Sequence, residues 1–432
     1  MKRNLYSQFK DLSHLGKWLL ISIITGVLTG SAVAWFLMGL KWASKYRDQN
    51  LWLLWLLPIA GLVIGLIYHY LGQNVVKGNN QLLEELSKPE KIIPLRMAPL
   101  VAIGTIITHL FGGSAGREGT GVQMGGAIAD QFSKVFKLCN EQRKTLIICG
   151  IAAGFSAVFG TPIAGAVFAL EVYIIGRLQY ESILPAFLSA IIADRVCIAW
   201  NFPVPITHTQ YLNPEALELS PTTLICTLIV AILFGWTALI FSKANHFWAG
   251  LFSKKINWPP LRPFIGGIIL ALAFWGLSKT SIDHTKYIGL GIPVIEQSFS
   301  EQMMSYDFVL KILFTSFTLG CGFKGGEVTP LFFIGATLGS TLSGFIPLPV
   351  GILAAIGFVG VFAGATNTPI ACTLMGIELF GAQIAVYLAL SCVVAYIFSG
   401  HSSIYSAQIV GHTKTPSLKN DQNKALDNID KK

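Results

Sequence analysis

A glycine-rich turn at residues 113–120, with the sequence GSAGREGT, combines an ionisable side chain with the geometry of an anion site. Its glycines let the backbone turn tightly and let a ligand approach closely. A helical pattern begins at about Val122, so we expect a helix N-terminus here, where free N–H groups and the helix dipole favour an anion. Glu118 lies between two strongly apolar segments, where an ionisable residue is costly and indicates a functional site. The turn would therefore hold both an anion and a carboxylate that can carry a proton.

The second half of the chain contains a related turn. Residues 325–329 read GGEVT, and Glu327 lies 209 residues after Glu118. The block TPIA at residues 161–164 recurs at residues 368–371, 207 residues later. Two blocks at nearly one offset indicate two related halves, about residues 15–200 and 215–400. Glycine-interrupted spans at matching places in two halves indicate a transporter whose site lies between the repeats. Sequence similarity alone leaves open whether the repeats are parallel or inverted.

Each TPIA block is typical of a helix that starts at a capping threonine followed by proline. We interpret both blocks as plain helix starts. A glutamate follows each threonine by ten residues, at Glu171 and Glu378. These glutamates would lie near the far ends of the helices, so we expect them to be solvated at the membrane interface.

The composition predicts an all-α membrane protein that crosses the bilayer several times. Of the 432 residues, 53% are apolar and 12% are charged, whereas soluble domains carry about 25% charged residues. Apolar runs recur along the whole chain, and several are short or interrupted by glycine or proline. We therefore expect broken, tilted helices, whose exposed backbone must be covered by protein or by an aqueous cavity.

The net charge of +9 could suggest nucleic acid, but the basic residues lie in the two tails and in short loops. We expect no nucleic-acid partner, and we expect both termini in the cytoplasm of a protein of the inner (plasma) membrane. The predicted parts are a cytoplasmic N-terminal segment (1–15), a first transmembrane repeat (16–205), a second one (206–410) and a disordered cytoplasmic tail (411–432).

Metal and enzyme chemistry have no support in the sequence. The seven cysteines are scattered without a Cys-x-x-Cys pair, and the eight histidines show no His-x-x-x-His spacing. No nucleophile–base pair or cofactor motif adjoins the glycine turns. We predict that the protein is not an enzyme and uses no metal and no cofactor.

Two further segments have open interpretations. Residues 77–80 (KGNN) are either an ordinary surface turn or another helix start, at which Asn79 would offer an amide to an anion. Tyr405 precedes the basic tail, where a tyrosine usually anchors the chain at the interface.

Taken together, these segments resemble the CLC family of chloride channels and proton-coupled anion antiporters. Residues 116–119 (GREG) look like the family's Gly-Arg-Glu-Gly-Pro element, and residues 325–330 (GGEVTP) look like its Gly-Gly-x-Phe-x-Pro element. Tyr405 falls where the family places its anion-binding tyrosine. The resemblance implies a CLC-like fold of two inverted repeats, with helix ends around a dehydrated anion. It also implies a homodimer with one pore per subunit, and a carboxylate at Glu118 that acts as gate and proton carrier.

Four departures from the family pattern narrow the resemblance. Thr120 replaces the proline of the first element, and residues 77–80 replace the usual Gly-Ser-Gly-Ile-Pro loop. Glu327 stands where chloride-handling members carry an apolar residue, and Val172 stands where the internal proton glutamate would align. Together these departures resemble the fluoride/proton antiporter clade of bacterial CLC proteins.

The resemblance implies proton-coupled export of fluoride from the cytoplasm, with fluoride and protons as the transported partners in a lipid membrane. Removing water from fluoride requires close donors, since an unpaired buried ion is very costly. Ionised Glu118 would compete for the anion's position, and protonated Glu118 would leave it, which couples opposite movements of F⁻ and H⁺. Glu327 either replaces the internal proton acceptor or satisfies a helix start. The alternative is a chloride channel or Cl⁻/H⁺ antiporter of the same fold. The predicted anion-binding residues are Asn79, Asn80, Gly116, Arg117, Gly119, Thr120, Gly326, Val328, Thr329 and Tyr405.

Overall fold

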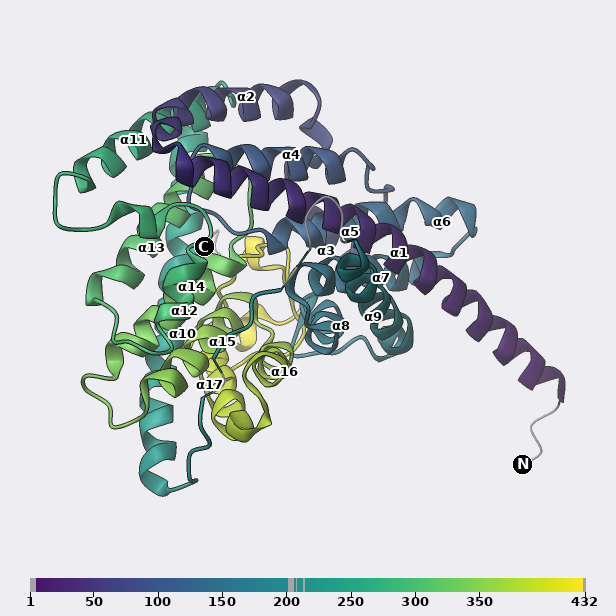
Figure 1. Ribbon diagram of the computed structural model, residues 1–432. Coiled ribbons are helices and arrows are strands. Elements are labelled where there is room, and N and C mark those ends of the chain that lie inside the picture. Colours follow the sequence, from purple (N-terminus) through teal and green to yellow (C-terminus); the bar gives the residue numbers. More distant parts are fainter. Residues whose placement is uncertain (1–4, 201–205, 207, 213, 430–432) are drawn as a thin grey trace.

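The structure, a computed structural model, describes residues 5–200, 206, 208–212 and 214–429, and these are almost entirely helical (Figure 1). The first half contains α1 (Leu5–Gln49), α2 (Leu57–Tyr70), α3 (Asn79–Ser87), α4 (Met97–Leu110), α5 (Glu118–Asp130), α6 (Phe132–Val135), α7 (Asn140–Phe159), α8 (Pro162–Glu171) and α9 (Ile183–Ala199). The second half contains α10 (Pro221–Lys255), α11 (Leu261–Leu277), α12 (Ile292–Gln297), α13 (Ser305–Gly320), α14 (Val328–Leu342), α15 (Val350–Thr366), α16 (Pro369–Phe380) and α17 (Ala385–Phe398). α1 passes without a break through the boundary that we expected after residue 15.

The helix lengths confirm the predicted membrane fold. Four helical segments of the described chain are long and apolar enough to cross a membrane: Ser13–Gln49, Leu51–Tyr70, Tyr180–Ala199 and Pro221–Lys255. Shorter apolar helices of 10–17 residues accompany them. Among these, α14 is buried from Val328 to Thr341. Protein therefore covers the backbone at the ends of a helix too short to span alone, as a bilayer requires.

The two halves repeat one packing pattern. α5 packs on α7, and α7 on α9, in the same way that α14 packs on α15, and α15 on α17. The first contact depends on glycine in both halves, since a Cβ on Gly125 would lie 2.0 Å from the Gly150 carbonyl oxygen. A Cβ on Gly335 would lie 2.1 Å from the Gly357 carbonyl oxygen. Figure 1 shows the halves meeting along α8 and α16.

Two carboxylates join α8 and α16 reciprocally. Glu171, at the end of α8, accepts hydrogen bonds from the Ile370 and Ala371 N–H groups at the start of α16 (3.1 and 2.8 Å). Glu378 of α16 in turn accepts two bonds from the first turn of α8 (3.0 and 2.7 Å). The helices run antiparallel, which is the relation expected of inverted repeats.

This contact corrects our expectation of interfacial solvation for Glu171 and Glu378, because each carboxylate caps the helix start of the other half. The prolines occupy the first helical turns as predicted. Thr161 and Thr368, which precede them, make no side-chain cap bond. The N–H groups that a threonine would have capped are satisfied by a residue about 200 positions away.

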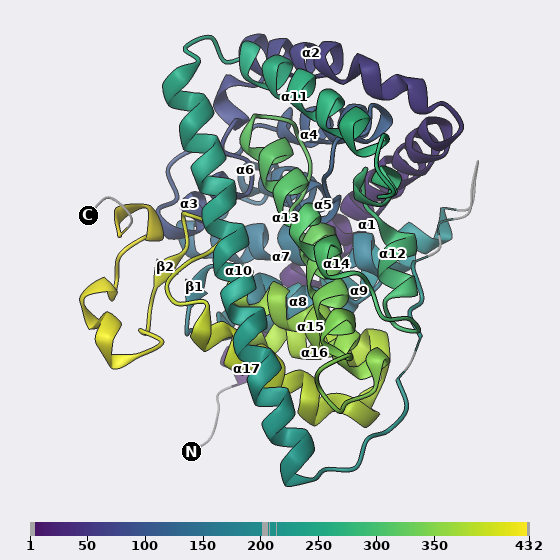
Figure 2. The same ribbon diagram turned by 90° about the vertical axis from the view of Figure 1, so that its left-hand side faces the viewer.

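The C-terminal segment corrects a second expectation, since the predicted disordered tail is folded through Ile429. β2 (Ile409–Val410) pairs in parallel with β1 (Ile174–Ile175). The ammonium group of Lys414 donates to the side chain of Asn367 (2.5 Å) and to the carbonyls of Gly400 (2.6 Å) and Tyr396 (2.7 Å). In Figure 2 this yellow segment lies on the side of the molecule that carries β1, α3 and α10. The N–H groups of Asp427 and Leu426 donate to the carbonyls of Ser406 and Gln408 (3.0 Å each), so the segment covers the chain just after Tyr405.

Candidate functional site

The two glycine turns meet at the centre of the molecule. The Gly116 N–H donates to the Gly326 carbonyl (2.6 Å), and the Gly326 N–H donates to the Gly116 carbonyl (2.8 Å). α5 begins at Glu118 and α14 begins at Val328, directly after these bonds. The positive ends of two helices therefore converge on one place, which favours a negative charge between them.

The Glu118 carboxylate occupies that place. Its Oε2 accepts hydrogen bonds from the Thr329 N–H (2.9 Å) and from the Arg117 N–H (3.2 Å), and its Oε1 accepts one from the Thr329 hydroxyl. The Arg117 Nε lies 3.6 Å from Oε1. The carboxylate is 1% exposed. Donors from both helix starts thus hold a carboxylate where they could instead hold a free anion.

The close approach of the turns leaves no space for side chains at two glycines. A Cβ on Gly326 would lie 2.8 Å from the Gly119 nitrogen and 3.2 Å from the Glu118 nitrogen. A Cβ on Gly119 would lie 2.9 Å from the Asn79 amide nitrogen. Glycine at these positions keeps the N–H groups accessible, and it brings Asn79 of α3 to the first turn of α5.

Two cavities lead to the site. The first, which we call the Glu118 vestibule, has a wide part of about 240 Å³ whose wall includes Arg117, His208, Thr209 and Ile292. Arg117, Thr209 and Ile292 also line a narrow continuation that reaches Glu118 and Thr329.

The second cavity, the Glu327 vestibule, has a volume of about 270 Å³ and is lined by Asn79, Asn80, Lys324, Glu327 and Tyr405 among others. Among the lining residues of the described chain, none is shared by the two vestibules. Glu118 and Glu327 therefore face separate cavities, with the paired glycine turns between them.

The remaining predicted residues have different surroundings. The Thr120 hydroxyl pairs with Thr105 of α4 (2.7 Å). The Asn80 side chain accepts a bond from the Ala407 N–H (3.1 Å), which ties α3 to the Tyr405 segment. Val328 is buried in the first turn of α14. Val172, with Asn79 and Tyr405, lines a small apolar gap and offers no proton-carrying group there.

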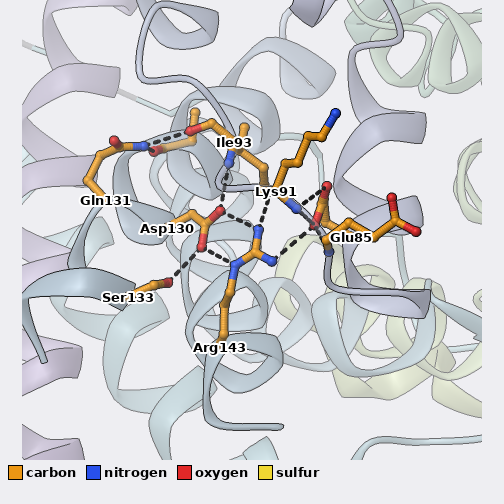
Figure 3. Close-up of polar contacts among 9 residues, drawn as sticks. Glu85, Lys91, Ile93, Asp130, Gln131, Ser133 and Arg143 are labelled. Atoms are coloured by element: carbon orange, nitrogen blue, oxygen red, sulfur yellow. Dashed lines mark hydrogen bonds and ion pairs between the residues drawn. The ribbon is translucent and has the colours of Figure 1, made fainter. Parts of the chain in front are cut away.

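A buried ion-pair network, which the sequence did not reveal, fixes the position of α3 (Figure 3). The Arg143 guanidinium binds both oxygens of Asp130 (2.7 Å each), Glu85 (3.0 Å) and the Lys91 carbonyl (2.6 Å). These groups join the end of α3 and the following loop to the end of α5 and the start of α7. The network thereby holds both helices whose first turns carry Asn79 and Glu118.

Sequence reasoning also missed the residues that line the narrow passage to Glu118. Tyr211 and Thr209 come from an irregular segment without periodicity, and Phe332 comes from α14, where it stacks on Phe358 at 3.8 Å between ring centroids. No local signal distinguishes these aromatic residues from ordinary core. Within the described residues, no group of three or more His, Cys, Asp and Glu side chains could hold a metal ion.

Two helix starts that converge on a buried carboxylate, at the junction of inverted helical repeats, are the arrangement expected of an anion-conducting or anion-transporting membrane protein. Residues 60–400 match the model of a family described as voltage gated chloride channel. The chain belongs to this family, the CLC family, as the sequence resemblance predicted.

Two of the similar proteins are named for fluoride. A "Chloride/fluoride channel protein" of Pseudomonas syringae pv. tomato is 49% identical over 408 residues, which cover 94% of this chain and 89% of the relative. A solved structure described as a CLC-type fluoride/proton antiporter is 36% identical, with a TM-score of 0.86 over 91% of this chain and 98% of that one. An "H(+)/Cl(-) exchange transporter ClcA" of Cronobacter sakazakii is 26% identical over 90% of this chain and 88% of the relative.

Proposed function

We propose that this protein exports fluoride from the cytoplasm in exchange for protons, with Glu118 as the gate and proton carrier. The observation that carries the proposal is the position of the Glu118 carboxylate, held by the Thr329 N–H, the Thr329 hydroxyl and the Arg117 N–H. Fluoride accepts hydrogen bonds as a carboxylate oxygen does, so the same donors suit both. Two fluoride-named relatives, at 49% and 36% identity, support fluoride as the anion.

Exchange follows from competition for these donors. Ionised Glu118 and fluoride cannot occupy one site together, because two negative charges would repel each other at short range. Glu118 takes a proton from its vestibule, becomes neutral and releases the donors to fluoride arriving from the Glu327 vestibule. Glu327 accepts the proton on the opposite side, in place of the glutamate that is missing at Val172. Each cycle therefore moves the proton and the anion in opposite directions.

Fluoride must exchange its water for donors in the site. The N–H groups of Gly116 and Gly326, which we predicted as anion donors, are used in the bonds between the two turns. We assign the other backbone N–H groups of the two turns, the Asn79 amide and the Tyr405 hydroxyl to this shell. Asn79 and Tyr405 line the Glu327 vestibule together, which supports their role on the path from that cavity. This proposal places the Glu327 vestibule and both termini on the cytoplasmic side of the inner membrane.

The protein is also proposed to act as a homodimer. Large apolar side chains are exposed on α8 and α16 and on the adjacent α9 and α17. They include Ile163 (44%) of α8, Ile370 (48%) of α16, Ile191 (45%) of α9 and Val393 (46%) of α17. A contiguous apolar surface is typical of an interface or of lipid contact. Cross-linking between cysteines placed at Ile191 and Val393 in liposomes would distinguish a dimer from a lipid-facing surface.

The function is tested in proteoliposomes that carry a proton gradient. The Glu118→Gln variant is expected to lose proton-coupled fluoride flux, because a neutral amide neither carries the proton nor repels the anion. Coupled transport at the wild-type rate in this variant would refute the mechanism. Two names also favour a second candidate. The 49% identical relative is named for a chloride/fluoride channel, and the 26% identical ClcA is named for H⁺/Cl⁻ exchange, so the alternative is a chloride channel or Cl⁻/H⁺ antiporter. Fluoride and chloride electrodes in the same liposomes distinguish the two functions.

A further inference from the structure

His208, on the wall of the Glu118 vestibule, lies beside the buried Asp194, and the mechanism above uses neither residue. Nε2 of His208 lies 3.6 Å from Oδ1 of Asp194, a fully buried residue of α9. Both atoms are buried and neither has a hydrogen-bond partner within the described part of the chain. The other Asp194 oxygen, Oδ2, accepts two bonds from Arg195 (2.8 and 2.5 Å). One carboxylate oxygen thus remains available to the imidazole.

A close contact with the end of α7 supports the His208 ring. The ring packs on Gly160 at the end of α7, where a Cβ would lie 2.4 Å from the ring carbon Cδ2. Gly160 has φ +75°, which itself favours glycine. The His208 side chain keeps 15% of its surface exposed, on the wall of the wide part of the vestibule.

The vestibule provides a route from His208 to Glu118. His208, Thr209 and Arg117 line the wide part, and Thr209 and Arg117 also line the narrow part that ends at Glu118. A volume of about 240 Å³ accommodates several water molecules, each of which occupies about 30 Å³ in the liquid. The narrow part beside Glu118 has a volume of about 10 Å³, which is roughly the space of one water molecule. A chain of water molecules through both parts can carry a proton between the two side chains.

The charges around the pair allow His208 both to take up and to release a proton. Asp194 stabilises the imidazolium, whereas Arg117 on the same vestibule wall opposes it. Among the described residues, the other titratable groups that face the pair or the vestibule include Lys41 of α1, Arg195 and Cys197 of α9, Tyr211, and Glu378 of α16. An imidazole ring can accept a proton at one nitrogen and donate one from the other, which is what a relay requires.

We propose that His208 is the proton relay that loads Glu118 from the solution on its side of the membrane, with Asp194 as the residue that positions the ring. A hydronium ion or buffer acid gives its proton to His208. The imidazolium passes a proton through vestibule water to the Glu118 carboxylate and returns to the neutral form. This assignment rests on the proposed fluoride/proton exchange, since it supplies the proton that Glu118 carries.

The test is the rate of fluoride-coupled proton flux in proteoliposomes, measured with the Glu118 side at a series of pH values. His208→Ala is expected to slow the flux about tenfold near neutral pH, a modest share of the acceleration that a positioned acid–base group can supply. The loss should shrink at acidic pH, where hydronium protonates Glu118 directly. Imidazole added on the Glu118 side should restore the rate, while the F⁻:H⁺ ratio and the fluoride KM stay unchanged.

Matched variants separate the relay from a structural role. His208→Gln, which cannot titrate, should behave like His208→Ala and carries the test if the alanine variant does not fold. His14→Ala removes an exposed histidine of α1 and should leave the rate and its pH profile unchanged. Asp194→Asn should give a smaller loss with the same pH dependence, because it removes only the charge that stabilises the imidazolium.

Each outcome decides the proposal. If wild-type protein moves fluoride without protons, the exchange function fails and the relay fails with it. If wild type couples and His208→Ala keeps the wild-type rate and pH profile, only the relay is refuted. A slow variant that imidazole does not rescue, and that is equally slow at acidic pH, would also refute the relay, since His208 would then be merely structural.

Discussion

Alanine at Gly326 would test the paired helix starts directly. Its methyl group would lie 2.8 Å from the Gly119 nitrogen and 3.2 Å from the Glu118 nitrogen. The 2.8 Å distance is shorter than real Cβ atoms show. Gly326 does not have a positive φ, so its φ angle does not exclude alanine. The clash with two backbone nitrogens would instead force the two turns apart. The methyl group would therefore cover the N–H donors that are proposed to bind fluoride.

The expected loss follows from the number of donors covered. A hydrogen bond to a charged group contributes about 1.5–3 kcal/mol. Losing one such bond would weaken fluoride binding about 10- to 150-fold, and losing both would weaken it further. Binding is measured by titration calorimetry on purified protein, and transport by the initial rate of fluoride efflux from liposomes as a function of fluoride concentration.

Gly276→Ala is the matched control, because a Cβ at that position of α11 has no atom within 4 Å. This variant should fold, bind and transport as wild type does. If Gly326→Ala binds fluoride with wild-type affinity, the donors at Glu118 and Gly119 do not contact the anion, and the proposed site is wrong.

Two further predictions concern the contacts that hold the site in place. Arg143→Met leaves the fully buried Asp130 carboxylate without its cation and should destabilise the fold by about 3–5 kcal/mol. A lower melting temperature in detergent would show this loss, and Arg143→Lys should lose less stability. An unchanged melting temperature would contradict the network's role. Glu378→Gln leaves one acceptor for two N–H groups of α8 and should cost about 1–3 kcal/mol of folding stability. The same melting assay checks it, and Glu181→Gln, at an exposed position of the 3-10 helix before α9, is a control whose melting temperature should not change.

Several features of the fold were predictable because they depend on local sequence. Low charge and recurrent apolar runs predicted a polytopic helical membrane protein, and Pro162 and Pro369 predicted two helix starts that the structure confirms. The matched blocks around Glu118 and Glu327 predicted two related halves. These signals lie within a few residues of one another, so they can be read without knowledge of the packing.

The C-terminal segment shows where local reasoning was wrong. Residues after 411 are polar and basic, which is typical of disorder. In the fold, Lys414 reaches carbonyl groups at the end of α17, and β2 finds β1. This short polar segment folds because its partners belong to the ordered helical body. Its own composition contains no sign of those partners, so the sequence did not predict the fold of the segment.

The sequence by itself determined that an ionisable residue lies in each of two glycine turns inside a membrane protein, because composition, turn chemistry and repetition are local properties. Only the tertiary structure decided which groups meet there. Thr329 came to donate to Glu118 across 211 residues, Glu171 and Glu378 came to cap each other's halves, and His208 came to face Asp194. The physical reason is that a polar group in a buried site takes whatever partner the packing of distant helices brings within about 3 Å, and neither partner's sequence neighbourhood identifies the other.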